Sequence, residues 1–309
     1  MVVHERGRFG EQVTTAGIHR YAVIGNPIAH SKSPQIHALF ARATGQAMSY
    51  ERLLAPLDGF TQTLQRFARE AGRGANVTLP FKQQAFALAR EHTERARAAA
   101  ACNTLAWRGD HWLGDNTDGA GLLRDLVHNR GERVRGRRVL VLGAGGATRG
   151  ILQPLLAERP RQVVIANRTL ERAHALATLA AGFIDGAVVA PASLAELAGE
   201  RFDLVINATS AGVAVGSTED RAREPPWANI GFAPDALAYD LSYADQATPF
   251  LRWSAEHGAT RTADGLGMLI EQAAESFLLW RGVRPDSTPA AALLRPDSCA
   301  VPAARQVQI

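Results

Sequence analysis

A lysine and an aspartate in two short motifs are the residues of this chain best suited to proton transfer. Lys82 follows an apolar run in VTLPFK, and Asp118 lies in the polar turn GDNTDG. A lysine beside a carboxylate can take the hydroxyl proton of an alcohol as hydride leaves the carbon. The same residue types also form ordinary ion pairs or surface charges, so both interpretations stay open. Lysine is rare here, because all but Lys32 and Lys82 of the 34 basic residues are arginine.

Small hydroxyl and amide side chains occur in loops elsewhere in the chain. Each of them is also a common cap or turn residue. Together they suit a polyhydroxylated acid, because every hydroxyl of such a ligand needs a donor and an acceptor. The candidates are Ser31, Ser33, Thr78, Asn103 and Gln272. Lys32, between the two serines, is expected in solvent beside this site.

A glycine cluster between a predicted strand and a predicted helix indicates a nucleotide site. The run RRVLVLG over 137–143 lacks alternation, which is typical of a parallel strand buried on both faces. The following GAGGA lets the backbone turn sharply and places a pyrophosphate on the helix N-terminus. Gly143 and Gly145 fill two positions of G-x-G-x-x-G, and Thr148 occupies the third.

The end of the next predicted strand favours NADP over NAD. Where an NAD site carries an acidic residue for the ribose, this chain has Asn167-Arg168-Thr169 and then Arg172. Guanidinium groups there can pair with a 2′-phosphate, although they could also belong to a solvated face. Thr209 and Ser210, in INATS, are expected near the nicotinamide or in a turn cap.

Composition excludes several other classes of function. The charge sum of 34 − 30 gives +4, and no basic run is interleaved with aromatics, so nucleic acid is not an expected partner. No apolar run reaches about 18 residues, so no membrane span is expected.

No two histidines have metal-ligand spacing on one helix face, and no metal is predicted. Cys102 and Cys299 exclude a disulfide framework and fit a reducing, cytoplasmic compartment; Cys102 is expected to be a small buried residue.

Short apolar runs alternate with helical stretches, which predicts an α/β fold with a parallel sheet. The predicted strands are 21–25, 74–80, 103–107, 137–143, the apolar part of RQVVIANRT, 202–210 and 236–242. Helices are expected from Ser33-Pro34, over 119–129, after GAGGA, over 170–180 and over 267–282. Residues 1–18 and 286–309 are predicted to be flexible tails.

Taken together, the motifs closely resemble those of the shikimate dehydrogenase family. They occur in order as YAVIGNPIAHSKSPQIH, GANVTLPFK, CNTL, LGDNTDGAGLL, VLGAGGATRG, ANRT, INATSAG and GLGMLIEQAAESFLLW. The resemblance implies the reversible NADPH-dependent reduction of 3-dehydroshikimate to shikimate, in chorismate and aromatic amino-acid biosynthesis. It also implies two domains: an α/β substrate domain over 19–118 and a Rossmann-like NADP-binding domain over 119–265. The last helix, 266–285, would then pack back on the substrate domain.

The same resemblance assigns roles by matching position. Lys82 and Asp118 would be the catalytic acid–base pair. The implied substrate contacts are Ser31, Ser33, Thr78, Lys82, Asn103, Asp118, Tyr243 and Gln272, the two serines holding the carboxylate. The implied cofactor contacts are Glu94, Gly143, Ala144, Gly145, Gly146, Ala147, Asn167, Arg168, Thr169, Arg172, Thr209, Leu241 and Gly265. The loop 211–231 departs from the family pattern, as do Ser242 and Asp245 beside Tyr243.

Two other functions remain open. A quinate/shikimate dehydrogenase that uses NAD is disfavoured by the HSKSP serines and by Asn167-Arg168-Thr169. A non-catalytic NADP-binding sensor of the same fold is disfavoured because Lys82 and Asp118 are both present. The expected partners are therefore a small-molecule substrate and NADP. The sequence leaves open whether the chain forms a homodimer.

Overall fold

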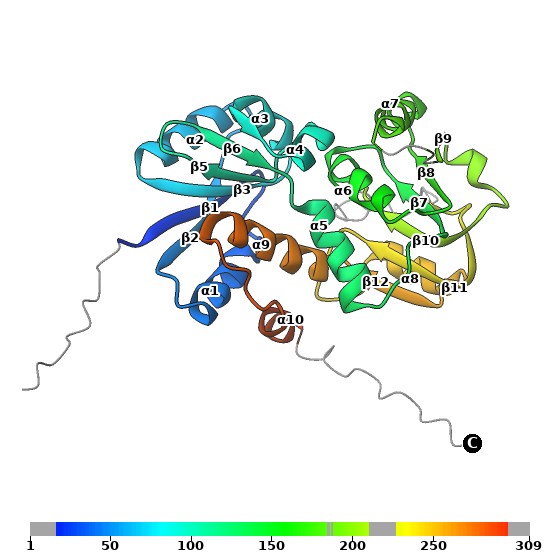
Figure 1. Cartoon of the computed structure of the whole chain (residues 1–309). Helices are drawn as coiled ribbons and strands as arrows, with labels where there is room; N and C mark the ends of the chain where they lie inside the picture. The colour runs from blue at the N-terminus through cyan, green and yellow to red at the C-terminus, as the bar shows by residue number, and fades with distance from the viewer. Residues whose placement is uncertain (1–16, 184–185, 187, 210–226, 296–309) are drawn as a thin grey trace, which may run out of the picture.

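Two α/β halves meet at helices α5 (Asp118–Leu123) and α9 (Leu266–Arg281) in the computed structural model of the chain (Figure 1). The structure describes residues 17–183, 186, 188–209 and 227–295. Each half is built on one six-stranded sheet. This confirms the predicted fold class, in which an α/β half precedes a Rossmann-like half and the last long helix returns to the first.

The first half carries a mixed sheet in the order β2-β1-β3-β5-β6-β4. Its strands are β1 (His19–Gly25), β2 (Met48–Leu54), β3 (Gly72–Val77), β4 (Glu91–His92), β5 (Thr104–Trp107) and β6 (Trp112–Asp115). Strand β1 pairs in parallel with β2 and β3, whereas β5 is antiparallel to both of its neighbours. The helices of this half are α1 (Ser33–Ala43), α2 (Phe60–Arg69), α3 (Lys82–Leu88) and α4 (Glu94–Ala99).

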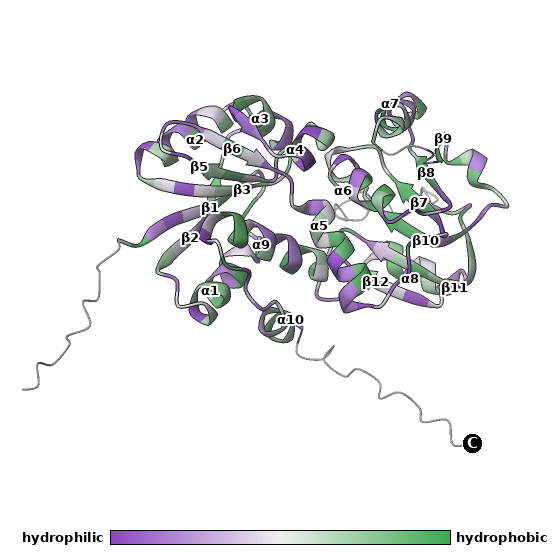
Figure 2. Ribbon diagram, viewed as in Figure 1, coloured by the Kyte–Doolittle hydropathy of each residue, from purple (hydrophilic) through white to green (hydrophobic). Residues whose placement is uncertain are grey.

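The second half carries an all-parallel sheet in the order β12-β11-β10-β7-β8-β9. Its strands are β7 (Arg138–Leu142), β8 (Gln162–Ala166), β9 (Val189–Ala192), β10 (Arg201–Asn207), β11 (Gly231–Asp240) and β12 (Arg261–Asp264). Helices α6 (Gly146–Ala157), α7 (Leu170–Ala181) and α8 (Pro249–Glu256) cover this sheet. Hydrophobic residues run along β7 and β8 (Figure 2).

The central strand β7 explains why the apolar runs lack alternation. Val139 and Val141 belong to one hydrophobic cluster, and Leu140 and Leu142 belong to a second cluster on the opposite face. Successive strand residues point to opposite faces, so a strand covered on both sides must be apolar at every position.

Helix α5 is clamped between α6 of the second half and α9. A Cβ added to Gly119 would lie 2.5 Å from Pro154 Cγ, and one added to Gly121 would lie 2.7 Å from the Gln272 backbone. Glycine is therefore required for this close approach. A single π-helical turn over Arg124–Asn129 then leads the chain into the second half.

The chain returns to the first half through α9. Ile270 and Phe277 of α9 pack with Ile36 and Phe40 of α1 in one cluster. A further helix, α10 (Thr288–Leu294), adds the buried Ala290 to this cluster, although the segment 286–309 was expected to be a flexible tail. Among the residues that the structure describes, no helix is long and apolar enough to cross a membrane.

Candidate active site between the two halves

The structure brings Lys82 and Asp118 together. Lys82 is the first residue of α3 and Asp118 the first residue of α5, and Lys82 Nζ contacts Asp118 Oδ2. Both side chains are largely covered, with exposed fractions of 15% and 8%. The backbone N–H of Cys102 donates to the Lys82 carbonyl at 2.9 Å, which ties the start of α3 to the segment before β5. The two residues therefore form a largely covered ion pair in which the carboxylate orients the ammonium.

Asn103 holds the other carboxylate oxygen. Its Nδ2 donates to Asp118 Oδ1 at 2.7 Å, and its Oδ1 accepts from the backbone N–H of Thr117 at 2.8 Å. Since a backbone N–H can only donate, the amide oxygen must face Thr117 and the NH2 group must face Asp118. Gln272 Oε1, from α9, accepts from the same NH2 group at 3.1 Å.

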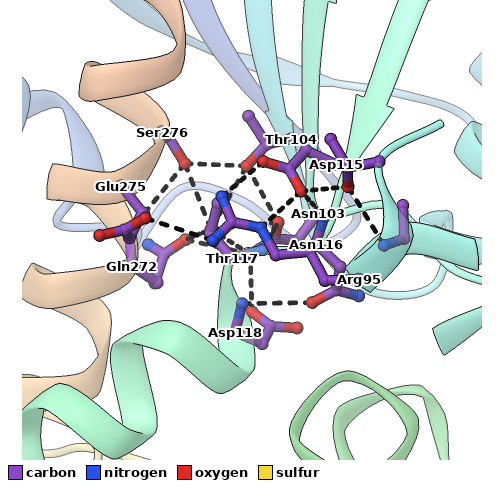
Figure 3. Close-up of polar contacts among 12 residues, drawn as sticks. Arg95, Asn103, Thr104, Asp115, Asn116, Thr117, Asp118, Gln272, Glu275 and Ser276 are labelled. Atoms are coloured by element: carbon purple, nitrogen blue, oxygen red, sulfur yellow. Dashed lines mark hydrogen bonds and ion pairs between the residues drawn. The ribbon is translucent and has the colours of Figure 1, made fainter. Parts of the chain in front are cut away.

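A buried polar network lies behind Asn103 (Figure 3). Thr104 Oγ1 donates to Asn103 Oδ1 at 2.9 Å and lies 2.8 Å from Ser276 Oγ. Asn76 Nδ2 donates to Thr104 Oγ1 at 3.1 Å and to Ser276 Oγ at 2.9 Å, and the Tyr50 hydroxyl donates to Asn76 Oδ1 at 2.7 Å. The network therefore joins β2, β3, β5 and α9.

Asn103 is the one member of this network that was identified from the sequence; Tyr50, Asn76, Thr104 and Ser276 were not. The available signal was a polar side chain within an otherwise apolar strand, as in GANV or NTLAW. Asn76 and Thr104 are buried, and a buried polar group costs free energy unless it is hydrogen-bonded. The rule therefore predicts that Asn76 and Thr104 have hydrogen-bond partners, but it does not identify the distant residues that supply them.

A second polar cluster supports the turn before Asp118. The Arg95 Nε and Nη2 atoms donate to the two carboxylate oxygens of Asp115 at 2.7 and 2.6 Å. Asp115 in turn accepts from the backbone N–H of Asn116 at 2.7 Å, and Asn116 Oδ1 accepts from the Asp118 N–H at 3.2 Å. This chain of contacts positions the start of α5.

The predicted carboxylate-binding serines lie together at the start of α1. Ser31 Oγ and Ser33 Oγ are 3.2 Å apart, and both residues are buried. Arg52 of β2 donates from Nε and Nη2 to the Ser31 carbonyl at 2.9 and 2.5 Å. Thr78 follows β3 and is half-buried, with its N–H bound to the Ile24 carbonyl at 3.0 Å.

Tyr243 reaches this region from the second half. Its ring packs against the α1–α9 cluster, and burial raises the pKa of its hydroxyl. Lys32 Nζ lies 5.7 Å from the centre of the Tyr243 ring and 3.4 Å from Asp245 Oδ1. Lys32 lies beside the site as expected: its side chain is 25% exposed, and its contact with Asp245 of the other half is at the surface.

The glycine turn has the form predicted for a pyrophosphate site. Strand β7 ends at Leu142, and α6 begins at Gly146. Gly143 has φ +98°, which favours glycine, while Gly145 and Gly146 border open space where a Cβ would meet nothing within 4 Å. In the third position, Thr148 Oγ1 donates to the Gly143 carbonyl at 2.7 Å, so a buried hydroxyl braces the turn.

Asn167 connects this turn to the end of β8. Its Oδ1 accepts from the Ala144 N–H at 3.2 Å, and its Nδ2 donates to the Thr169 carbonyl at 2.8 Å. Arg168 and Arg172 are exposed, and neither forms an ion pair with another residue that the structure describes. Their charges therefore remain available to an anionic ligand.

Three other predicted cofactor residues, Thr209, Leu241 and Gly265, follow strands β10, β11 and β12 of the second sheet. Thr209 Oγ1 donates to Asn207 Oδ1 at 2.7 Å, and the Leu241 N–H donates to the Asn207 carbonyl at 2.9 Å. Gly265 touches the Leu241 carbonyl so closely that a Cβ would not fit. Ala147 lies in the first turn of α6, and Glu94 begins α4, which packs against α6. Ser210 and most of the loop 211–231 fall outside the described residues.

Cys102 is not a reactive thiol. It is fully buried, and burial raises its pKa to about 12. A thiol in this state is a poor nucleophile, in agreement with the packing role predicted from sequence. Within the described ranges, no group of three or more His, Cys, Asp or Glu side chains is arranged to hold a metal ion.

Comparison with known proteins decides the family. Three family models match in chain order: the shikimate dehydrogenase substrate binding domain over 23–105, shikimate / quinate 5-dehydrogenase over 125–225, and the shikimate 5′-dehydrogenase C-terminal domain over 265–295. A shikimate dehydrogenase (NADP(+)) from Aromatoleum aromaticum is 56% identical over 278 residues, covering 90% of this chain and 97% of that protein. This chain belongs to the shikimate dehydrogenase family.

Two further relatives support the assignment. A shikimate dehydrogenase (NADP(+)) from Alkalilimnicola ehrlichii is 53% identical, with 90% of this chain and 99% of that protein covered. The crystal structure of shikimate 5-dehydrogenase from Thermus thermophilus, in complex with NADP(H) and shikimate, is 33% identical with a TM-score of 0.76. That match covers 90% of this chain and 99% of the other.

Proposed function

We propose that this chain is a shikimate dehydrogenase that catalyses the reversible NADPH-dependent reduction of 3-dehydroshikimate to shikimate, a step of chorismate and aromatic amino-acid biosynthesis. The observation that carries the proposal is the Lys82–Asp118 pair with Asn103 and Gln272 around it, located where the two halves meet. Family membership supplies the reaction, and the geometry supplies the residues that perform it.

Lys82 acts as the acid and base in this proposal. In the reductive direction its ammonium gives a proton to the substrate oxygen, and in the oxidative direction its amine takes the proton from the substrate hydroxyl. Asp118 holds Lys82 in place by accepting from its Nζ and lies beside the same substrate oxygen. NADPH, when bound, supplies the hydride. The buried network behind Asn103 keeps the carboxylate oriented throughout.

The substrate site extends from this pair to the start of α1. Ser31 and Ser33 bind the carboxylate, while Thr78, Asn103 and Gln272 bind ring hydroxyls, each with donor and acceptor atoms. Tyr243 closes the site from the second half. The corresponding domains are 19–118 for substrate and 119–265 for NADP, with 266–285 returning to the first.

The residues around the glycine turn fit NADP. Gly143, Ala144, Gly145, Gly146 and Ala147 form the turn and the first turn of α6, whose N-terminus favours a pyrophosphate. Asn167 and Thr169 shape the end of β8, and Arg168 and Arg172 pair with the 2′-phosphate. Glu94, Thr209, Leu241 and Gly265 complete the proposed cofactor contacts.

One assay tests the proposal against its alternatives. Purified protein is incubated with shikimate or quinate, each with NADP+ or NAD+, and reduced nicotinamide is followed by absorbance. Turnover with shikimate and NADP+ alone is the expected result. Comparable rates with quinate or NAD+ would indicate a quinate/shikimate dehydrogenase. No turnover despite NADP+ binding would indicate a sensor.

We also propose a cytoplasmic location, which the free, buried thiol of Cys102 supports because reduced cysteines are usual there. Sedimentation of the assayed protein would test whether it is a homodimer.

A further inference from the structure

Arg52 occupies a special position beside the two serines. Its Nε and Nη2 atoms both donate to the Ser31 carbonyl, which holds the guanidinium against the start of α1. A guanidinium carries five N–H donors, so most of them remain available after these two contacts. Arg52 is exposed, and it forms no ion pair with any residue that the structure describes.

Two other positive charges beside the substrate site have a carboxylate partner among the residues that the structure describes. Lys82 is paired with Asp118, and Lys32 is paired with Asp245 at 3.4 Å. Arg52 has no carboxylate partner among the described residues. Within the described ranges Arg52 is therefore an uncompensated positive charge beside the two serines, and it matches the single negative charge of a monocarboxylate.

The Arg52 charge also affects a side chain from the second half. Burial raises the pKa of the Tyr243 hydroxyl, and the charge of Arg52 opposes that rise. Arg52 is thus within electrostatic range of a side chain that comes from the other half. The serine hydroxyls can orient a carboxylate, but they carry no net charge to offset its loss of hydration.

We propose that Arg52 is a specificity-determining residue that supplies the counter-charge for the substrate carboxylate. The inference rests on the proposed function and deepens it, because it names the residue that makes the enzyme prefer an acid to a neutral analogue. Ser31 and Ser33 set the orientation of the carboxylate, and Arg52 sets the affinity for its charge.

The test compares shikimate with its methyl ester, which keeps the hydroxyls and lacks the charge. Arg52→Gln should raise KM for shikimate about tenfold, because a hydrogen bond to a charged group is lost at a partly solvated site. The kcat should change less than threefold, and KM for the ester should not change. Arg52→Lys should recover part of the affinity for shikimate.

Arg42→Gln is the matched control. Arg42 lies in the last turn of α1, at the opposite end from Ser33, and is exposed. The control removes the same charge and should leave both KM values unchanged. An Arg52→Gln variant that weakens acid and ester equally, or neither, would overturn the inference.

Calorimetry of shikimate and ester binding separates this inference from the proposed function, because it needs no turnover. Protein that binds shikimate through Arg52 but does not oxidise it would contradict the proposed function alone. Protein that oxidises shikimate equally well with Gln at position 52 would contradict the inference alone. Failure to bind shikimate at all would overturn both.

Discussion

Asn103 Nδ2 lies 2.7 Å from Asp118 Oδ1, while Lys82 contacts the other oxygen of the same carboxylate. Both oxygens therefore have a fixed donor before any ligand binds. Asn103 is itself locked by the backbone N–H of Thr117 and by Thr104. Such an arrangement is preorganised, so little reorientation is needed when the proton moves.

The first prediction concerns this pair. Lys82→Ala removes the group that exchanges the proton, and kcat should fall by about 100-fold to 10,000-fold, the range for general acid–base catalysis. The affinity for NADP+, measured by fluorescence titration, should stay nearly unchanged, because Lys82 is distant in sequence from the glycine turn and on the other half of the fold. Full turnover by this variant would disprove the acid–base assignment.

The second prediction concerns the buried network. Ser276→Ala removes the nearest of the three acceptors around the Asn76 NH2 group and a hydrogen-bond partner of the Thr104 hydroxyl, so the free energy of unfolding should fall by about 1 kcal/mol. The kcat/KM for shikimate should fall severalfold as Asn103 loses support. Ser254→Ala is the control, since Ser254 is also fully buried but its Oγ has no hydrogen-bond partner among the described residues. Chemical denaturation should show a lower free energy of unfolding for Ser276→Ala and an unchanged value for Ser254→Ala.

The third prediction concerns the choice of cofactor. Arg168→Ala should weaken NADP+ binding about tenfold or more, because a charge-assisted hydrogen bond to phosphate is lost, and should leave NAD+ binding nearly unchanged. Arg161→Ala is the matched control, because Arg161 is exposed just before β8 whereas Arg168 follows its other end. Equal losses for the two cofactors in Arg168→Ala would contradict the 2′-phosphate assignment.

The fourth prediction concerns stability in acid. His37 is fully buried against the Tyr50 ring, and burial lowers its pKa from 6.5 to about 3. Below pH 6.5 the His37 side chain is therefore protonated in the unfolded chain but neutral in the folded chain. The free energy of unfolding falls as the pH drops from 6.5 towards 3. At pH 5 the free energy of unfolding is therefore lower by about 2 kcal/mol, at 1.36 kcal/mol per pH unit below 6.5. His37→Phe should remove this loss, so its stability relative to the native chain should rise between pH 8 and pH 5; a constant difference would refute the assignment.

The central strands of the second half were predicted from the sequence, whereas β9, α8 and β12 were not. The runs that form β7 and β8 are apolar at every position after the first, and only a strand covered on both faces requires that pattern. The glycine turn follows because Gly143 must adopt a positive φ. For both the strands and the glycine turn, the local sequence was sufficient to predict the structure.

The first half was less predictable. Strand β2 has the sequence MSYERLL and lies at the edge of its sheet, where polar residues are tolerated, so its pattern carries little signal. Helix α10 is a short stretch, TPAAALL, that is stabilised by packing against α1 rather than by its length. The partnership of Lys32 with Asp245 spans both halves, and only the assembled fold brings those side chains together.

Because Asn76 of β3 donates to Ser276 of α9, synthesis of the chain imposes an order on its folding. The two residues are 200 positions apart. At about 5–20 residues per second, a ribosome that has added Asn76 needs roughly 10–40 s more to reach Ser276. During that interval the nascent amino-terminal half has neither α9 packed against α1 nor the Ser276 hydroxyl of its buried network. The half that forms first on the ribosome is therefore the last to reach its final structure.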